Sequence, residues 1–207
     1  MQSSQSKHKG LPIWVYLIIG ILLAIPIFFV IRHLRETAIQ TAITQATDAH
    51  GDEVGAIIAE FEIAGHNLNV YKNADERAAA YTGDSLQAIS QSEASANADT
   101  VWTVVTQAHV TDTRVIEYSA NKIRAVACVS EDQLQLNDKG KLLKQLGTKN
   151  FMGAYVMVNE NGVWKQADYL DVTDATMAQS QYKKMSAAEQ TAIGSLTYLL
   201  DFRCDSQ

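Results

Sequence analysis

The sequence predicts an α+β protein with a single N-terminal transmembrane helix, a domain of helices packed on a curved antiparallel sheet, and a C-terminal helix. Three observations predict this class. An uncharged apolar run lies near the N-terminus, helical periodicity follows it, and strand-type runs fill most of the second half. Helices that precede a group of consecutive strands are typical of α+β domains, in which the helices cover an antiparallel sheet.

The apolar run from Leu11 to Ile31 predicts the transmembrane helix. It has 21 residues and no charged residue, and a helix of that length spans about 31 Å, close to the hydrocarbon core of a bilayer. Trp14 and Tyr16 lie where aromatic rings favour the membrane interface. We therefore expect a short tail over residues 1–10, a bilayer around residues 11–31 and a juxtamembrane helix or linker over residues 32–51.

A buried core helix and a cleaved signal peptide are two other interpretations of this run. A core helix of this length rarely lacks every polar side chain. Signal peptides have a shorter apolar region of about 7–15 residues, followed by small residues. Here Arg32 and Arg35 follow the run, so we adopt the uncleaved anchor.

The net charge of −6 divides into two parts of opposite sign. The first 35 residues carry four Lys/Arg and no acidic residue, whereas the rest carry 13 Lys/Arg and 23 Asp/Glu, a net charge of −10. This acidic part excludes a nucleic-acid partner, because phosphate binding needs clustered cations. Two Lys/Arg flank each end of the apolar run, so the positive-inside rule does not distinguish the two orientations. A short N-terminal tail favours an N-terminus that stays in the cytoplasm. We expect a cell-membrane protein with its N-terminus in the cytoplasm and its domain outside.

After the anchor, residues 52–64 predict an amphipathic helix. Gly51 and Gly65 are expected to interrupt or end the helical segments on either side of it, and short helical segments are expected around residues 73–80 and 86–89. The apolar stripe of the amphipathic helix has i, i+3, i+4, i+7 spacing and consists of Val54, Ile57, Ile58 and Phe61.

Four to five strands are expected after Asp99. Residues 122–129 alternate, so that every second side chain from Ile123 shares one face. The polar stretch 131–149 predicts a long loop. Asn161-Gly162 between two apolar runs is the strongest hairpin signal in the chain. The strand-type runs are residues 101–105, 115–118, 122–129, 151–158 and 163–169.

The C-terminal extension, residues 173–207, is expected to contain one helix. Ser186 and Glu189 have the S-x-x-E spacing of a capping box. Ile193, Leu196 and Leu200 then follow at helical spacing, which predicts a helix from about residue 186 to about residue 201.

These elements resemble the NTF2-like (cystatin-like cone) superfamily over residues 52–172. The resemblance is carried by the amphipathic helix, the Ala80–Leu86 element, the strand pair 114–131 and the closing hairpin 151–170. The build is similar to the intermembrane-space domain of chloroplast division proteins and to the inner-membrane scaffold subunit of type IV secretion systems. Both resemblances imply a role in protein–protein interaction.

No catalytic residue, cofactor or metal is expected. The sequence lacks the motifs of phosphate-binding loops, dinucleotide folds and serine hydrolases, and its five histidines show no metal-ligand spacing. Enzymes of the NTF2-like superfamily place an acid–base pair inside the cone. For this less favoured alternative, the candidates are Asp168, Tyr155, Tyr118 and His109.

A small-ligand binding module is the other alternative function. The resemblance implies a cone cavity, which we expect to be lined by Trp102, Tyr118, Tyr155 and Trp164. The two cysteines, Cys128 and Cys204, form a disulfide in one interpretation that requires an oxidising compartment. In the other interpretation, one is a buried thiol and the other a free thiol.

Two charged groups of residues have both a plain and a functional interpretation. An acidic run is a solvated helix face or a docking surface for a basic partner; it comprises Asp48, Asp52, Glu53, Glu60 and Glu62. A basic group is an exposed loop or a contact for anionic headgroups; it comprises Lys139, Lys141, Lys144 and Lys149. The expected function is a scaffold or accessory subunit whose partners are other membrane-complex subunits or a second copy.

Overall fold

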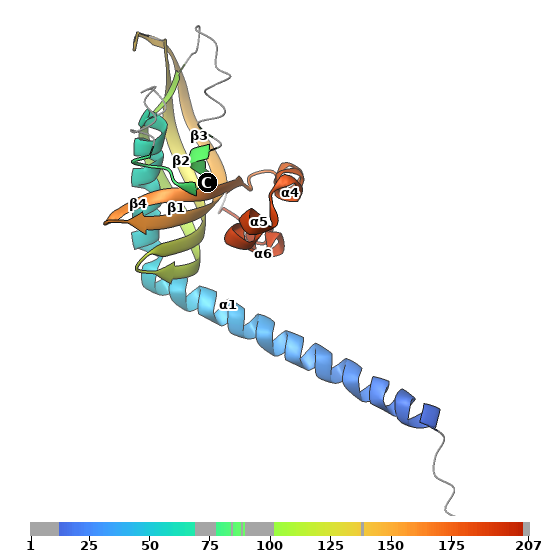
Figure 1. Cartoon of the computed structure of the whole chain (residues 1–207). Helices are drawn as coiled ribbons and strands as arrows, with labels where there is room; N and C mark the ends of the chain where they lie inside the picture. Colours follow the sequence, from blue (N-terminus) through green and yellow to red (C-terminus); the bar gives the residue numbers. More distant parts are fainter. Residues whose placement is uncertain are drawn as a thin grey trace, which may run out of the picture. The chain divides into compact units, whose positions relative to one another are not determined.

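The computed structural model describes residues 13–68, 78–83, 85–87, 89, 102–137 and 139–204. The chain divides into two compact units, Met1–Ala42 and Ile43–Gln207. The second unit is α+β with a four-stranded antiparallel sheet in the order β1-β2-β3-β4, which confirms the predicted class. The elements (Figure 1) are α1 (Ile13–Leu68), β1 (Trp102–Ser119), β2 (Lys122–Leu136), β3 (Leu142–Glu160), β4 (Val163–Asp171), α4 (Ala175–Lys184), α5 (Ala187–Ile193) and α6 (Leu196–Leu200).

In the first unit, α1 is helical from Ile13 and its side chains over residues 21–42 are exposed. Within the described part of the chain, no helix combines the length and the apolar character that crossing a membrane requires. Residues 1–12, which contain the predicted tail and the start of the predicted span, lie outside the described residues. The side chains of residues 13–20 lie outside them as well.

The helix α1 continues through Gly51 and Gly65, so the interruptions predicted at these glycines are wrong. Glycine inside a helix costs about 1 kcal/mol relative to alanine, which packing readily offsets. Two glycines also provide space. A Cβ atom at Gly55 would lie 3.3 Å from the Thr113 Oγ1 atom, and one at Gly65 would lie 2.8 Å from the Tyr81 hydroxyl. Small residues here therefore permit close packing around the helix.

The predicted apolar stripe of α1 packs against one face of the sheet. Val54 and Ile58 are fully buried, and Phe61 is 6% exposed. They share one hydrophobic cluster with alternate β2 residues from Ile123 to Val129, which confirms both the stripe and the alternation. We call this cluster the helix-side core. Burial of each such large side chain contributes about 1.5–3 kcal/mol, so the stripe is a main link between α1 and the sheet.

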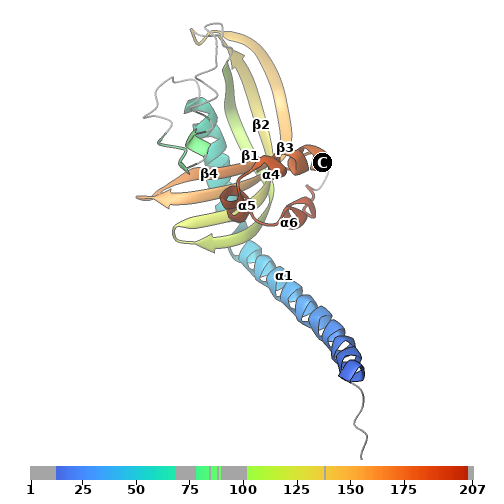
Figure 2. The same cartoon turned by 45° about the vertical axis from the view of Figure 1, so that its right-hand side comes forward.

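The other face of the sheet is covered by α4, α5 and α6, which Figures 1 and 2 show across the sheet from α1. Val126 and Cys128 of β2 pack there with Ile193 of α5 and Leu199 of α6. We call this second cluster the outer core. From residue 125 to residue 129 every residue of β2 is buried, because successive side chains enter opposite clusters.

The strands are fewer and longer than predicted. Residues 101–105 and 115–118 were expected as separate runs, but from Trp102 onward they belong to one strand, β1, which contains three register shifts. Extra residues in one strand bend it without ending it. The turn at Asn161-Gly162 is confirmed; the φ angles are 57° and 86°, the positive values that a type I′ hairpin turn requires.

The long loop predicted over residues 131–149 is wrong. These residues form the end of β2 and the start of β3, which pair from Glu131 with Lys149 to Leu136 with Leu142. Every described residue from 139 to 150 is exposed. Over residues 139–150 no apolar alternation marks a strand, since neither face is buried, and the alternation of Leu134 and Leu136 with glutamines is too short to predict one.

The single C-terminal helix predicted from residue 186 to residue 201 is also wrong. Gly194, with a φ of 97°, separates α5 from α6, since this angle lies outside the helical region. The predicted capping box is present: Glu189 N donates to Ser186 Oγ, and Ser186 N donates to the Glu189 side chain. The helix α4 before it was not predicted.

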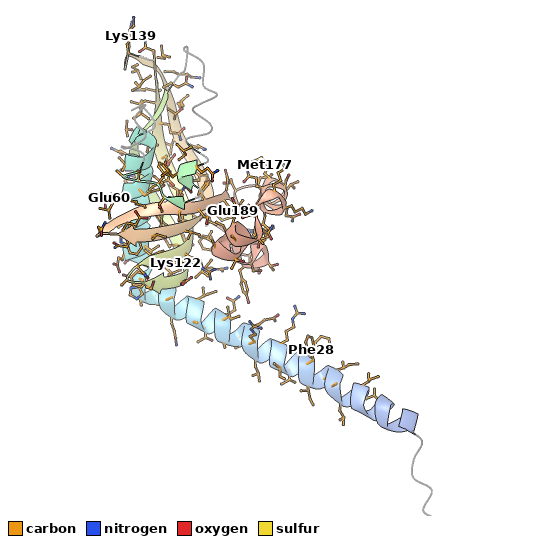
Figure 3. All side chains as sticks on the ribbon, viewed as in Figure 1. Phe28, Glu60, Lys122, Lys139, Met177 and Glu189 are labelled. Atoms are coloured by element: carbon orange, nitrogen blue, oxygen red, sulfur yellow. A yellow bond between two sulfur atoms is a disulfide. The ribbon has the colours of Figure 1, made fainter. Side chains whose placement is uncertain are left out.

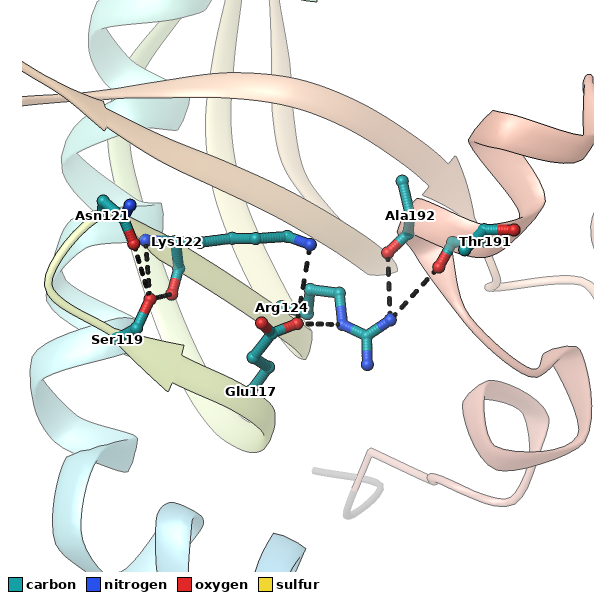
Figure 4. A network of polar contacts seen from close by, with 7 residues as sticks. All are labelled: Glu117, Ser119, Asn121, Lys122, Arg124, Thr191 and Ala192. Atoms are coloured by element: carbon teal, nitrogen blue, oxygen red, sulfur yellow. Dashed lines mark hydrogen bonds and ion pairs between the residues drawn. The ribbon is translucent and has the colours of Figure 1, made fainter.

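Arg124 of β2 fixes the end of α5 to the sheet. Its Nη1 atom lies 3.3 Å from the carbonyl oxygens of Thr191 and Ala192 (Figure 4). Its Nε atom lies 2.8 Å from Glu117 Oε2. The last carbonyls of a helix lack partners within the helix, so the guanidinium satisfies two of them and positions the C-terminal helices on the outer core.

Candidate functional site

The aromatic residues expected to line one cavity contact the helix-side core instead. Tyr155 is 1% exposed inside it, while Tyr118 and Trp164 are partly buried against it. None of these three lines either of the two clefts described below. The side chain of Trp102 lies outside the described residues. These three aromatic side chains therefore pack between α1 and the sheet and do not line a cavity there.

Glu62 lies in the core and not on the solvated face predicted for it. Glu62 is 3% exposed, and the Tyr155 hydroxyl donates to Glu62 Oε1 at 2.5 Å. A buried carboxylate is costly unless it is hydrogen-bonded, and the phenol provides that bond. Glu62 follows the buried Ile58 by four residues, so helical spacing alone places it on the apolar stripe. That signal could have found it.

A cleft of about 450 Å³ opens beside this pair, and its lining comes from α1, from Tyr81, Ser85 and Ile89, from β2, β3 and β4, and from the α4–α5 segment. Among the described residues that line it, the charged ones are Lys149 and five acidic residues, Glu62, Glu131, Asp168, Asp171 and Glu189. We call it the acidic cleft. It contains Asp168, one of the acid–base candidates, but neither Tyr155, Tyr118 nor His109 lines it. The structure therefore does not bring the predicted acid–base set together.

The buried tyrosines near this cleft resist ionisation. Burial, followed by the Glu62 charge, raises the pKa of Tyr155 well above its usual value of 10.0. Burial also raises the pKa of Tyr169, with Asp171 as the next cause. Both phenols are consequently neutral hydrogen-bonding groups at neutral pH.

We expect Tyr155→Phe to lower the free energy of unfolding by about 1–3 kcal/mol at neutral pH, because it removes a donor from a buried carboxylate. The pKa of the folded-state phenol is raised above 10.0, so the folded protein keeps a proton that the unfolded chain releases. The contribution of this phenol to the free energy of unfolding is fully present below pH 10 and declines as the pH rises further. In Tyr155→Phe the free energy of unfolding should therefore fall less steeply above pH 10 than in the parent chain.

Urea unfolding measured from neutral pH to above pH 10 checks both effects. Tyr198→Phe is the matched control, since Tyr198 lies in α6 and its backbone carbonyl, not its hydroxyl, accepts a bond from Arg114. Equal alkaline declines for the parent chain and Tyr155→Phe would contradict the expected proton linkage.

A second cleft, of about 520 Å³, opens on the outer face of the sheet beside a disulfide. The disulfide joins Cys128 of β2 to Cys204, 76 residues later in the chain. This is the pair that the sequence offered, and its formation leaves no free thiol. Apolar side chains and the disulfide form much of the wall, and Arg203 is the one charged residue among the described residues that line it. We call it the disulfide cleft.

The end of the β2–β3 hairpin, residues 139–150, exposes leucines among lysines. Leu142, Leu143 and Leu146 are 48%, 53% and 39% exposed. Figure 3 shows Lys139 at this end of the sheet. β4 pairs with β3 only from Gly153 onward, so among the described strands only β2 pairs with this part of β3. We call residues 139–150 the hairpin end.

The arrangement is suited to binding through two clefts of opposite charge and one basic, apolar end of a sheet. Within the described ranges, no group of three or more His, Cys, Asp or Glu residues could hold a metal ion. No protein-family model matches the chain, and no curated protein matches it.

Proposed function

We propose that the chain is a single-pass cell-membrane protein whose extramembrane domain is a scaffold or accessory subunit that assembles through the hairpin end. The observation that carries this proposal is the exposure of three leucines within a segment that also contains four lysines. Exposed apolar side chains that cluster at one place mark interaction surfaces more often than isolated ones do.

The proposed anchor is the uncharged run over residues 11–31, with cations at both ends. The disulfide between Cys128 and Cys204 supports an extracytoplasmic domain, because disulfides persist in oxidising compartments. A helix packed on one face of an antiparallel sheet is compatible with the NTF2-like resemblance, which itself implies protein interaction. These three features together support a tethered binding domain.

The proposed occupant of the hairpin end is α1 of a second copy. Asp48, Asp52 and Glu60 are exposed on α1, at spacings that keep them on one side of the helix. Lysines at the hairpin end complement these carboxylates, and the leucines add apolar contact. Two different surfaces meet in this contact, so it forms either reciprocally in a two-fold dimer or head to tail in a ring or a filament.

Packing inside the domain favours this function over ligand binding in the cone. Tyr155, Ile58 and Met157 pack between α1 and the sheet and are at most 1% exposed, and the cleft beside them is lined by five carboxylates. A ligand-binding cone would need an enclosed apolar cavity with a few converging polar groups. Interaction through the outer surface is therefore the function that the geometry supports best.

The charge-reversed chain Lys141→Glu/Lys144→Glu should sediment as a single copy in mild detergent at low salt, whereas the parent chain should form larger species. Each introduced glutamate then repels the acidic side of α1, whereas the lysine that it replaces attracts it. Asp52→Lys/Glu60→Lys should likewise be a single copy. Mixing the two variants should restore the larger species, because each then offers a surface complementary to the other.

Analytical ultracentrifugation of the purified full chain gives the oligomeric state. Lys183→Glu/Lys184→Glu, which reverses two exposed lysines of α4, is the matched control and should assemble as the parent does. A parent chain that remains a single copy in several detergents would overturn the proposal. Loss of assembly in the α4 control would also overturn it, since net charge and not the hairpin end would then be responsible.

A further inference from the structure

We propose that the disulfide cleft binds a carboxylate with one unbranched alkyl chain, such as a medium-chain fatty acid. The carboxylate lies at Arg203 and the alkyl chain lies along the apolar wall. The proposed assembly depends on the leucines and lysines of the hairpin end, none of which lines this cleft; Asn150 is the one described residue that the two share. Its volume of about 520 Å³ falls within the usual range of ligand sites, about 300–1,000 Å³.

The wall of the cleft is suited to an alkyl chain. Met152 of β3 and Val172 after β4 line it and are 6% and 1% exposed. Cys128, which is 2% exposed, brings the disulfide into the same wall. A thioether and a disulfide are polarisable, and an unbranched methionine side chain adapts to chains of different length. The wall therefore offers dispersion contacts with little demand on ligand shape.

Arg203 gives the cleft its preference for anions. The residue is exposed, and its Nη1 atom donates to the backbone carbonyls of Leu200 and Phe202. These bonds hold the guanidinium at the end of α6, beside the cleft. A guanidinium binds carboxylates through charge-assisted hydrogen bonds, and the described lining contains no acidic residue that would compete for it.

Polar groups around the wall add to this preference. Ser130, Asn150 and Thr173 also line the cleft, and Thr173 is held in place because its hydroxyl oxygen accepts a bond from Met152 N at 2.8 Å. The acidic cleft, lined by five carboxylates, disfavours the same ligand. A carboxylate with an apolar chain is thus the ligand class that matches one cleft and not the other.

Methionine methyl NMR of the full chain in neutral phosphatidylcholine nanodiscs tests the proposal with decanoate as the probe. The chain has five methionines, of which Met152 lines the disulfide cleft. Met157 lies in the helix-side core, on the other face of the sheet, so it serves as the internal control. Decanoate should shift the Met152 signal saturably and leave the Met157 signal unchanged.

Affinity should depend on both ends of the ligand. Each added methylene should tighten binding about fourfold, in a series from octanoate to laurate. Arg203→Gln should weaken decanoate binding about tenfold or more, and Arg203→Lys should retain part of the affinity. Lys184→Gln, which removes an exposed cation from α4, is the matched control. Decanol should bind the parent chain as weakly as decanoate binds Arg203→Gln.

Three results would overturn the proposal. The first is a Met152 signal that does not move, and the second is a shift that grows linearly, which indicates partition into the lipid. The third is equal affinity of the parent chain and Arg203→Gln for decanoate. Because the readout reports the cleft and not the oligomeric state, failure of this proposal leaves the assembly experiment unaffected.

Discussion

Replacing Cys128 and Cys204 together by serine should lower the free energy of unfolding by about 4 kcal/mol. The disulfide closes a loop with a sequence separation of 76 residues, and the chain-entropy account of cross-links gives this magnitude for a loop of that length. The closed loop contains β3, β4 and all three C-terminal helices. Without the cross-link, the unfolded chain gains conformational freedom that folding must then remove.

Denaturant unfolding of the oxidised parent chain and of the double variant measures this difference. Reducing agent should destabilise the parent to the level of Cys128→Ser/Cys204→Ser and should not affect the variant. The variant should still fold, since Arg114 and Arg124 also hold the C-terminal helices by bonds to Tyr198 and α5 carbonyls. A loss below about 1 kcal/mol would contradict the expectation.

Ile58→Ala should lower the free energy of unfolding by about 3 kcal/mol. Ile58 has no exposed surface and lies at the centre of the stripe that joins α1 to the sheet. Truncating a buried isoleucine costs about 2–5 kcal/mol, because transfer energy is lost and a cavity is left. The rigid strands β2 and β3 on the other side of the contact restrict collapse of that cavity.

Ile57→Ala is the matched control for this variant. It makes the same chemical change one residue away, at a side chain that is only partly buried against the core. Thermal and urea unfolding should give a clearly smaller loss for Ile57→Ala than for Ile58→Ala. Equal losses would mean that α1 does not pack on the sheet through the face containing Ile58.

The sequence predicts the parts of the fold in which one-sided burial or an unusual backbone angle restricts the residue types. The α1 stripe and the alternation in β2 were correct because burial on one side produces a clear period. The hairpin turn at Asn161-Gly162 was correct because few residues adopt its φ angles. In contrast, α4 was missed because Ala178 is its one buried residue, and an otherwise polar helix has no stripe to detect.

The candidate sites were harder to predict than the fold. Glu62 was grouped by its charge with the solvated acids, although its spacing from Ile58 places it on the buried side. The disulfide cleft joins Cys128, Met152, Val172 and Arg203, which come from separate parts of the chain. No local pattern connects such residues, so only the folded arrangement brings the cation to an apolar wall.

The complete burial of β2 between residues 125 and 129 has a consequence for how the sequence can vary. A strand with one solvent face accepts polar replacements at every second position. In this segment each position is committed to the helix-side core or to the outer core. Sequence drift in the strand is therefore restricted to small exchanges of similar volume, and accepted changes should be accompanied by a compensating change in whichever helix covers that side.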